Sequence, residues 1–166
     1  QAFAQMGVGK GTPVPTCTPY LIGVEPQPGE HIAWAESSAV SYANSVLGAR
    51  TNREGGPGAI AAAIVGRTGA YGLHLDTNRR ATLRVEVHTL PSSVSDYSAL
   101  GAVVGREARS AVPYFSGLLL EQGEPLWKEK LKALGAAMAA TGAVALYHVE
   151  GVTPEAMRSD VLTPGH

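Results

Sequence analysis

The sequence has 166 residues, enough for one domain with a sizeable core, and its 45% hydrophobic and 16% charged residues exclude a disordered chain. The formal net charge of −1, with acidic and basic residues mixed along the chain, gives no support for a nucleic-acid partner or for binding to a membrane surface. No apolar run is long enough to cross a bilayer, and a single cysteine cannot form an internal disulfide, so we expect a protein of the reducing cytoplasm.

The two ends of the sequence resemble neither a signal peptide nor a natural start. Gln1 begins the chain in place of an initiator methionine, and no basic segment followed by an apolar core comes after it. We therefore expect residues 1–166 to be a fragment of a longer polypeptide. Within them, no linker marks an internal domain boundary.

A loop rich in glycine and proline is expected first, over residues 7–19, with Pro13, Pro15 and Pro19 around Cys17. The run GVGKG at residues 7–11 has the wrong spacing for a phosphate loop and follows no apolar strand, so we reject it as a nucleotide site. Prolines fix the backbone angle φ and make the loop stiff. A stiff polar loop favours a ligand or a nucleophile at Cys17 over a buried structural cysteine.

A short buried strand over residues 31–34 and two helices are expected next. The first helix begins at Glu36, Ser37 and Ser38, whose side-chain oxygens can cap it, and ends at Gly48. The second helix begins at Gly56 and Pro57 and ends at Gly66. Apolar residues recur with helical spacing in both, namely Val40, Ala43, Val46 and Leu47 in the first, and Ile60, Ala61, Ile64 and Val65 in the second.

Strands and helices continue to alternate along the rest of the chain. The patterns predict a strand over 71–75, a polar turn over 76–80, a strand over 82–88, a helix over 95–110 capped by Ser95 with Leu100, Val103, Val104 and Ala108 inward, a strand over 112–120, a helix over 125–141 with Leu126, Leu131, Leu134, Ala137 and Met138 inward, a strand over 143–149 and a helix beginning at 153. Such alternation is typical of an α/β protein, here a layered α/β/α arrangement with a mostly parallel sheet.

The polar turn between the first two helices is the best candidate for an anion site. Arg50, Thr51, Asn52 and Arg53 lie there, and the Gly55-Gly56 pair lets backbone amides approach a ligand at the start of a helix. Arginine binds a carboxylate or a phosphate through two parallel hydrogen bonds. The alternative is a solvated connection between two helices that carries ordinary surface charges.

Other polar residues leave both a structural and a functional interpretation open. Ser37 and Ser38 serve as helix caps or as site hydroxyls, and Glu36 and Glu54 as acid–base groups or as partners of the arginines. The histidines in apolar surroundings are more often satisfied core groups than ligands, although the turn that follows the second of them favours a site there; they are His31, His74 and His148.

Five segments closely resemble the aconitase X family and together cover nearly the whole chain. They are PTCTPYL at residues 15–21, GEHIAWAESSAVSYANSVLGARTNREGGP at 29–57, GRTGAYGLHLDTNR at 66–79, SDYSALG at 95–101 and KALGAAMAATGAVALYHVEGVTPEA at 132–156. The resemblance implies an aconitase-like large part made of α/β/α domains, of which this chain is a fragment. It also implies a small swivelling domain or subunit as partner, with the active site between the two parts.

The resemblance further implies an iron-dependent hydro-lyase. Cys17 corresponds to an iron–sulfur ligand of the family, whose other cysteine ligands lie beyond this sequence. The catalytic serine is expected on the small domain, so the isolated fragment is expected to be inactive. Substrate contacts are expected from Ser37, Ser38, Asn44, Asn52, Arg53, Glu54, Gly55 and Gly56.

Two substrates of the family remain open, cis-3-hydroxy-L-proline, which would give Δ1-pyrroline-2-carboxylate, and mevalonate 5-phosphate. The near-neutral charge and the lack of a dense basic cluster favour hydroxyproline. A non-catalytic module that binds a carboxylate or phosphate, and a redox sensor built on Cys17, are the alternatives from other classes.

Overall fold

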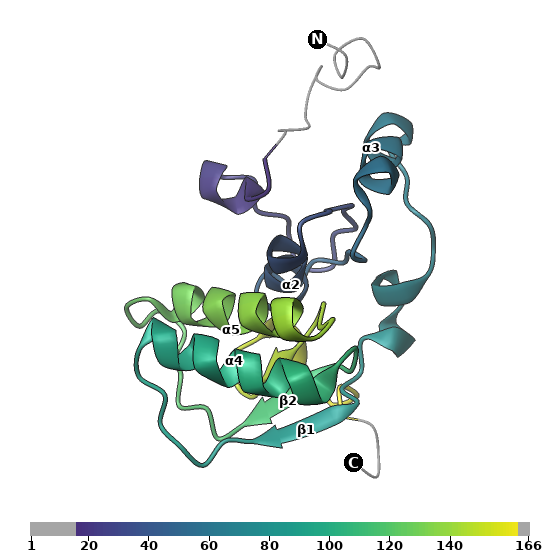
Figure 1. Cartoon of the computed structure of the whole chain (residues 1–166). Helices are drawn as coiled ribbons and strands as arrows, with labels where there is room; N and C mark the ends of the chain where they lie inside the picture. The colour runs from purple at the N-terminus through teal and green to yellow at the C-terminus, as the bar shows by residue number, and fades with distance from the viewer. Residues whose placement is uncertain (1–15, 163–166) are drawn as a thin grey trace.

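A three-stranded parallel sheet forms the base of the molecule in the computed structural model, which describes residues 16–162 (Figure 1). Its strands are β1 (Leu83–Glu86), β2 (Pro113–Ser116) and β3 (His148–Val149), in the order β1-β2-β3. Two helices, α4 (Val94–Ala108) and α5 (Trp127–Thr141), lie side by side on one face (Figure 1). The predictions of an α/β fold and of parallel pairing are confirmed. Residues 1–15, and with them the rejected phosphate loop, lie outside the described residues.

Alternation along β2 directs side chains to the two faces of this sheet. Phe115 joins the main core under α4 and α5. Tyr114, one residue earlier, packs on the opposite face against Ala156 and Val161, which belong to or follow the 3-10 helix η4 (Pro154–Met157). The second face is therefore covered by the C-terminal segment, which is a 3-10 turn where the sequence predicted a longer helix.

The two covering helices approach closely because glycine occupies their contact. A Cβ atom at Gly101 would lie 3.0 Å from the Ala137 side chain, and one at Gly105 would lie 2.8 Å from the Met138 backbone. Capping fixes the start of α4: Ser93 Oγ accepts from Asp96 N at 3.1 Å, and Asp96 Oδ2 accepts from Ser93 N at 2.9 Å. The predicted cap at Ser95 is therefore two residues too late.

Two residues expected to point inward on these helices point outward. Val103 of α4 is 54% exposed and Leu126, which precedes α5, is 58% exposed with a positive φ. The other residues predicted to point inward are buried or lie against the core. They are Leu100, Val104, Ala108, Leu131, Leu134, Ala137 and Met138.

Helix α2 (Ser37–Ser45) packs on α5 and is buried from Ala39 to Ser45. It begins at the predicted cap Glu36, but its C-cap is Val46, and Gly48 with φ 72° makes the turn that follows. Tyr147 fixes this layer, because its backbone N–H donates to Ser45 Oγ at 2.9 Å and its hydroxyl donates to Leu131 O at 2.7 Å.

All the predicted strands are shorter than expected or absent: those over 82–88 and 112–120 are reduced to β1 and β2, and the other three depart further. Residues 31–34 make only an isolated parallel bridge between His31 and Arg50. Residues 71–75 form the 3-10 helix η2 (Gly72–His74), because the Asn52 side chain, and not a neighbouring strand, accepts from Leu73 N at 2.7 Å. Residues 143–149, which were predicted as a strand, are mostly buried, yet only the last two of them, which form β3, pair with β2. The turn after η2 is as predicted and contains the 3-10 helix η3 (Asp76–Asn78).

Helix α3 (Gly56–Val65) has the predicted start at Pro57 and the predicted end at Gly66, whose φ is 67°. Its apolar stripe is not buried against the described residues, however, and Ile64 and Val65 are 49% and 66% exposed. The 3-10 helix η1 (Pro19–Ile22) is likewise without buried residues. Figure 1 shows η1 and α3 standing away from the sheet at the same end of the molecule. Among the helices of residues 16–162, none combines the length and apolarity needed to span a membrane.

Candidate functional site

The loop from Arg50 to Glu54, which carries most of the predicted site residues, is held from below by Asn44. The Asn44 amide nitrogen donates to Thr51 O at 2.8 Å and to Ala145 O at 2.9 Å. Its oxygen accepts from Thr51 N at 2.9 Å and from Arg79 Nη1 at 3.1 Å. Both donors and both lone pairs are used, and the side chain is buried. Asn44 therefore supports the loop and has no free group for a substrate, which corrects its predicted role.

Asn52 ties the same loop to the segment around η2. Its amide nitrogen donates to Tyr71 O at 3.3 Å and its oxygen accepts from Leu73 N at 2.7 Å. Gly72 lies between these two residues with a φ of 55°, and any Cβ there would collide with the Asn52 side chain. The main role that the structure gives Asn52 is thus to hold two loops together.

Arg53 follows Asn52 and is exposed. Among residues 16–162 its guanidinium has neither a hydrogen bond nor an ion pair with another side chain, whereas Arg50 is paired with Asp76. Of the two arginines that the sequence placed at an anion site, only Arg53 is available to a ligand.

Glu54 partly occupies the start of α3. A Cβ at Gly58 would lie 3.1 Å from Glu54 Oε2, so this carboxylate lies over the first turn of the helix, and Tyr71 Oη donates to its other oxygen at 3.4 Å. Gly55 is the N-cap and offers no side-chain bond, and Gly56 is exposed. A bound anion would have to share the helix N-terminus with the Glu54 charge.

Glu36, Ser37 and Ser38 form the N-terminus of α2 as capping groups. Glu36 Oε2 accepts from Ala39 N at 2.7 Å and from Ser38 Oγ at 2.5 Å. Partial burial works to raise the pKa of Glu36, but these hydrogen bonds and those from the Ser37 and Ser38 groups outweigh it and hold the pKa below its usual value. Glu36 is therefore a charged cap, and Ser37 and Ser38 remain half-buried beside it.

Cys17 is exposed and lies three residues before Tyr20, whose ring packs against Trp34 and Tyr42. Burial raises the pKa of the Tyr20 hydroxyl, and the nearby charge of Glu36 raises it further. Within the described part of the chain, no three side chains of histidine, cysteine, aspartate or glutamate gather as a set that could hold a metal ion. Cys17 can thus supply one ligand here, and a complete metal site needs ligands from other polypeptide.

Trp34 connects the Cys17 segment with the Arg53 loop. Its ring centroid lies 6.5 Å from that of Tyr20. Its backbone N–H donates to Thr51 Oγ1 at 3.1 Å, and its carbonyl accepts from Glu54 N at 3.3 Å. The predicted cysteine site and the predicted anion site therefore adjoin at one end of the molecule, the end that carries η1 and α3. We call it the open end.

Two histidines beside the loop contact each other, which their positions in the sequence did not predict. His31 Nδ1 and His74 Nδ1 are 2.9 Å apart, so one hydrogen joins them and only one of the two nitrogens carries it. Arg50 Nη1 donates to His74 O at 3.1 Å and fixes the buried partner. Burial lowers the pKa of His74, and the neighbouring His31, Arg79 and Arg50 lower it further against the opposing charge of Glu54. His148 is a core histidine whose Nε2 is 2.8 Å from Arg79 O.

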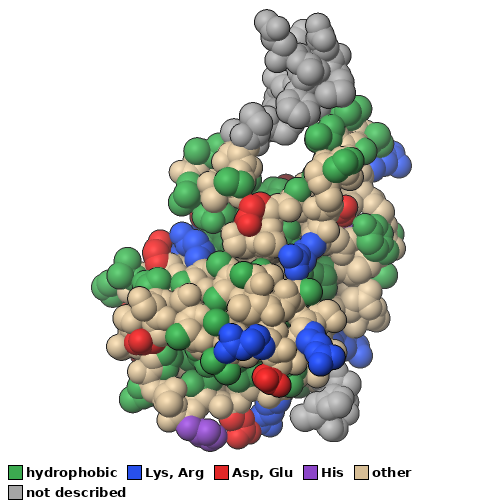
Figure 2. All heavy atoms as spheres, viewed as in Figure 1, with side chains coloured by type: hydrophobic (Ala, Val, Ile, Leu, Met, Phe, Trp, Pro, Cys, Tyr) green, Lys and Arg blue, Asp and Glu red, His purple; other side chains and the backbone are tan. Residues whose placement is uncertain are grey.

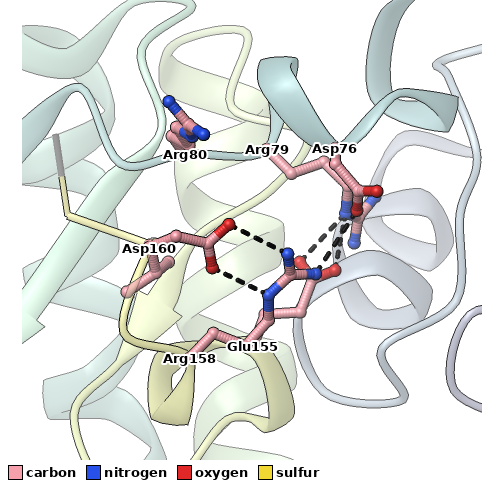
Figure 3. A pocket seen from close by; sticks show the side chains of 7 residues that line it. Asp76, Arg79, Arg80, Glu155, Arg158 and Asp160 are labelled. Atoms are coloured by element: carbon pink, nitrogen blue, oxygen red, sulfur yellow. Dashed lines mark hydrogen bonds and ion pairs between the residues drawn. The ribbon is translucent and has the colours of Figure 1, made fainter.

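Arg79 is the central residue that the sequence interpretation missed. Its Nε donates to both Glu155 oxygens at 2.8 and 2.9 Å, and its other nitrogens donate to Asn44, Leu73 O and Ala49 O. Figure 3 shows the shallow pocket around it, with Asp76, Arg80, Glu155, Arg158 and Asp160. Arg158 bridges Asp76 and Asp160, so the charges facing the pocket are largely paired with each other. The pocket is an ion-pair network and not the predicted site.

Comparison with known proteins relates both halves of the chain to one family. Residues 1–77 match the family model described as aconitase X first domain, and residues 81–164 match that described as aconitase X second domain. The phosphomevalonate dehydratase large subunit of Methanothermobacter thermautotrophicus is 65% identical over 87% of this chain and 35% of its own length. The cis-3-hydroxy-L-proline dehydratase of Pseudomonas aeruginosa is 42% identical over 94% of this chain and 26% of its own length.

A solved structure agrees with the fold described above. The crystal structure of Thermococcus kodakaraensis aconitase X in its holo-form matches with a TM-score of 0.80 and 56% sequence identity, over 92% of this chain and 39% of that chain. The chain spans about a third of the length of the curated relatives it matches most strongly, with 35% of the length covered in the first two of them.

Proposed function

Because this chain belongs to the aconitase X family, we propose that residues 1–166 are a fragment of the large catalytic part of a dehydratase, a hydro-lyase that removes water from a small β-hydroxy acid. Support comes from relatives named as dehydratases, at identities from 42% to 65%. The open end of the molecule is the part of this chain that faces the substrate.

The proposed substrate is mevalonate 5-phosphate. Relatives named as phosphomevalonate dehydratase large subunits are 65% and 60% identical to this chain, against 42% for the cis-3-hydroxy-L-proline dehydratases. This reverses the preference for hydroxyproline that the near-neutral charge suggested. Net charge is a poor guide to substrate here, because most basic residues of the described chain are neutralised by local ion pairs such as Arg50–Asp76 and Arg79–Glu155.

The observation that carries the proposal is the free Arg53 guanidinium on a rigidly held loop. Asn44 and Asn52 fix the backbone that precedes it through four hydrogen bonds to Thr51, Tyr71 and Leu73. The held backbone fixes where the Arg53 side chain starts, and its guanidinium can bind a phosphate or carboxylate through two parallel hydrogen bonds. The substrate class offers both groups.

Glu54 would tune this anchor. Its carboxylate lies over the first turn of α3, next to Arg53 in sequence, and repels a second anion at the same place. Tyr71, which donates to Glu54, holds the carboxylate there. This arrangement orients an anionic substrate towards the Arg53 side of the helix start.

Iron, held in part by Cys17, is the proposed cofactor. The single exposed cysteine fits one ligand position and no more, since the described residues offer no further ligand set. When bound, the metal would polarise the hydroxyl oxygen that leaves as water. The residues of this chain contribute anchoring and orientation of the substrate, because a dehydration needs the leaving hydroxyl and the α-proton held in a defined geometry.

A small subunit or small swivelling domain is the proposed partner, as the name of the first relatives, a large subunit, suggests. A catalytic serine and the remaining cluster ligands would come from polypeptide outside residues 1–166. The fragment alone is accordingly expected to lack activity.

The test is an anaerobic assay of the complete large subunit with its small partner, using mevalonate 5-phosphate and cis-3-hydroxy-L-proline in parallel. Turnover of the phosphate compound is expected, and turnover of hydroxyproline alone would reverse the substrate assignment. Binding of both compounds without turnover would instead favour the non-catalytic module.

The role of Arg53 is tested by Arg53→Ala with Arg67→Ala as the matched control. Arg67 is also exposed and also unpaired among the described residues, but it follows the far end of α3. The Arg53 variant is expected to lower kcat/KM about 100-fold, which corresponds to the loss of about 3 kcal/mol from a charge-assisted hydrogen-bonded pair. The Arg67 variant is expected to leave kcat/KM unchanged. Equal kinetics in both variants would remove Arg53 from the site. Glu54→Gln is expected to lower KM by removing the competing charge.

A further inference from the structure

Helix α3 is apolar on all sides and yet lies open. Its sequence, GPGAIAAAIV, contains no charged residue and no polar side chain, and none of its residues is buried against residues 16–162. A helix with this composition belongs in an interior, because a surface helix carries a polar face. A ten-residue helix is also too short to be stable in water by its own hydrogen bonds. Something must cover it in the working protein.

A second apolar projection stands at the same end. Leu21 and Ile22 of η1 are 68% and 54% exposed, and Val24 after it is 37% exposed. Figure 2 shows hydrophobic side chains gathered over both projections, with the molecule hollowed between them. Two unrelated segments that expose apolar side chains at one end indicate one continuous contact surface. We call it the α3–η1 face and define it by Leu21, Ile22, Val24, Ile60, Ile64 and Val65.

We propose that the α3–η1 face is a permanent interface, covered by another part of the same large-subunit polypeptide and not by the separable small subunit. Two observations choose this occupant. The chain accounts for only 35% of the length of its first relatives, so most of the polypeptide of such a subunit lies outside it. The two projections themselves expose apolar side chains, as permanent interfaces do, while charged residues such as Arg53 and Glu54 lie beside them at the start of α3.

The inference deepens the proposed function, on which it rests for the existence of a longer subunit. The face flanks Cys17 and Arg53, both of which are exposed in residues 16–162. A cover over α3 and η1 would exclude water from the space between them. Excluding water strengthens both the arginine–anion contact and the ligation of a metal by the thiolate.

Hydrogen exchange of the complete large subunit, measured with and without its small subunit, tests the choice of occupant. The backbone amides of α3 are expected to exchange about tenfold or more slowly than unstructured amides in the large subunit alone, and to change less than about twofold when the small subunit is added. Protection that develops only with the small subunit would overturn the proposal, and so would fast exchange in both samples. Exchange rates do not depend on turnover. The exchange result therefore tests the α3–η1 face even if the enzyme is inactive on both proposed substrates.

Two matched substitutions in the complete subunit give a second measurement. Val65→Lys places a charge in the face, whereas Val103→Lys places one on α4 at a site that is similarly exposed, at 54% against 66%. The first is expected to lower the folded-to-unfolded ratio at least about tenfold, and the second to leave it within about twofold. No effect of Val65→Lys on the folded-to-unfolded ratio would show that α3 is not covered.

Discussion

Arg79→Met is the most direct test of how the structure is held together. Arg79 is 3% exposed, and its guanidinium donates to the Glu155 carboxylate, to Asn44 and to the carbonyl oxygens of Leu73 and Ala49. It joins its own segment, which includes Leu73, to two others that are distant in the sequence, one at Asn44 and Ala49 and one at Glu155. Methionine has a similar length and can fill the space, but it satisfies none of these acceptors.

The expected loss follows from what the substitution leaves behind. Glu155 is only 13% exposed in its side chain, so without Arg79 a largely buried carboxylate loses its partner. Removing one member of a buried ion pair costs about 3–5 kcal/mol of unfolding free energy, most of it from the stranded charge. The several hydrogen bonds do not add to this in full, since removing the guanidinium from water on folding already costs free energy.

Chemical denaturation of the complete protein measures the loss, with Arg80→Met as control because the neighbouring arginine is exposed. The control is expected to stay within about 0.5 kcal/mol of the parent. A double variant, Arg79→Met with Glu155→Leu, is expected to recover part of the loss because it also removes the stranded carboxylate. A loss below about 1 kcal/mol for Arg79→Met, or no recovery in the double variant, would refute the assignment.

Three further outcomes follow from the described geometry. Ser93→Ala is expected to destabilise the protein by about 1 kcal/mol through loss of the α4 cap, and Ser95→Ala by nearly nothing, as compared by thermal denaturation. Burial lowers the pKa of His74, so this side chain binds a proton more readily in the unfolded state than in the folded state. The free energy of unfolding, measured in urea, should therefore fall as the pH drops below about 6.5, and His74→Asn should make it depend less on pH. Gly101→Ala should cost about 1–3 kcal/mol in the same denaturation assay because its Cβ meets α5, whereas Gly56→Ala, which meets nothing within 4 Å, should be neutral or stabilising.

Local signals in the sequence predicted the elements well wherever neighbouring residues decide the structure. Pro57 and Gly66 mark both ends of α3, and Glu36 caps α2 as expected. The alternation in β1 and the helical spacing in α5 also survive in the structure. These features depend on contacts within a few residues, which the sequence displays directly.

Contacts over long sequence distances account for the errors. The segment around Leu73 reads as a strand, but an amide 21 residues away takes its backbone hydrogen bond and bends it into a 3-10 turn. Asn44 reads as a polar site residue, although its partners at Thr51, Ala145 and Arg79 use all of its hydrogen-bonding capacity. Arg79 looks like one more charge in a polar turn, and only its partner Glu155, 76 residues later, explains its burial. Spacing in one sequence contains no sign of such pairs.

The arrangement of the candidate site residues in space was not visible in the sequence for the same reason. The grouping of Cys17 with the Arg53 loop depends on Trp34, whose ring and backbone touch the two sides, and neither contact is visible in the pattern of residues. Helix α3 was predicted with one apolar stripe, but it is apolar on all sides and none of its residues is buried among the described residues. Hydrophobic periodicity indicates that a face needs burial and does not indicate what buries it.

The position of Trp34 gives the protein a built-in optical reporter. The sequence has two tryptophans, and the other, Trp127, begins α5 and packs against the main core. Trp34 lies instead between Tyr20 and Thr51, so its emission responds to the polarity and order of the segments that carry Cys17 and Arg53. With Trp127 replaced by phenylalanine, fluorescence from a single indole would follow events at the open end in real time, without an added label.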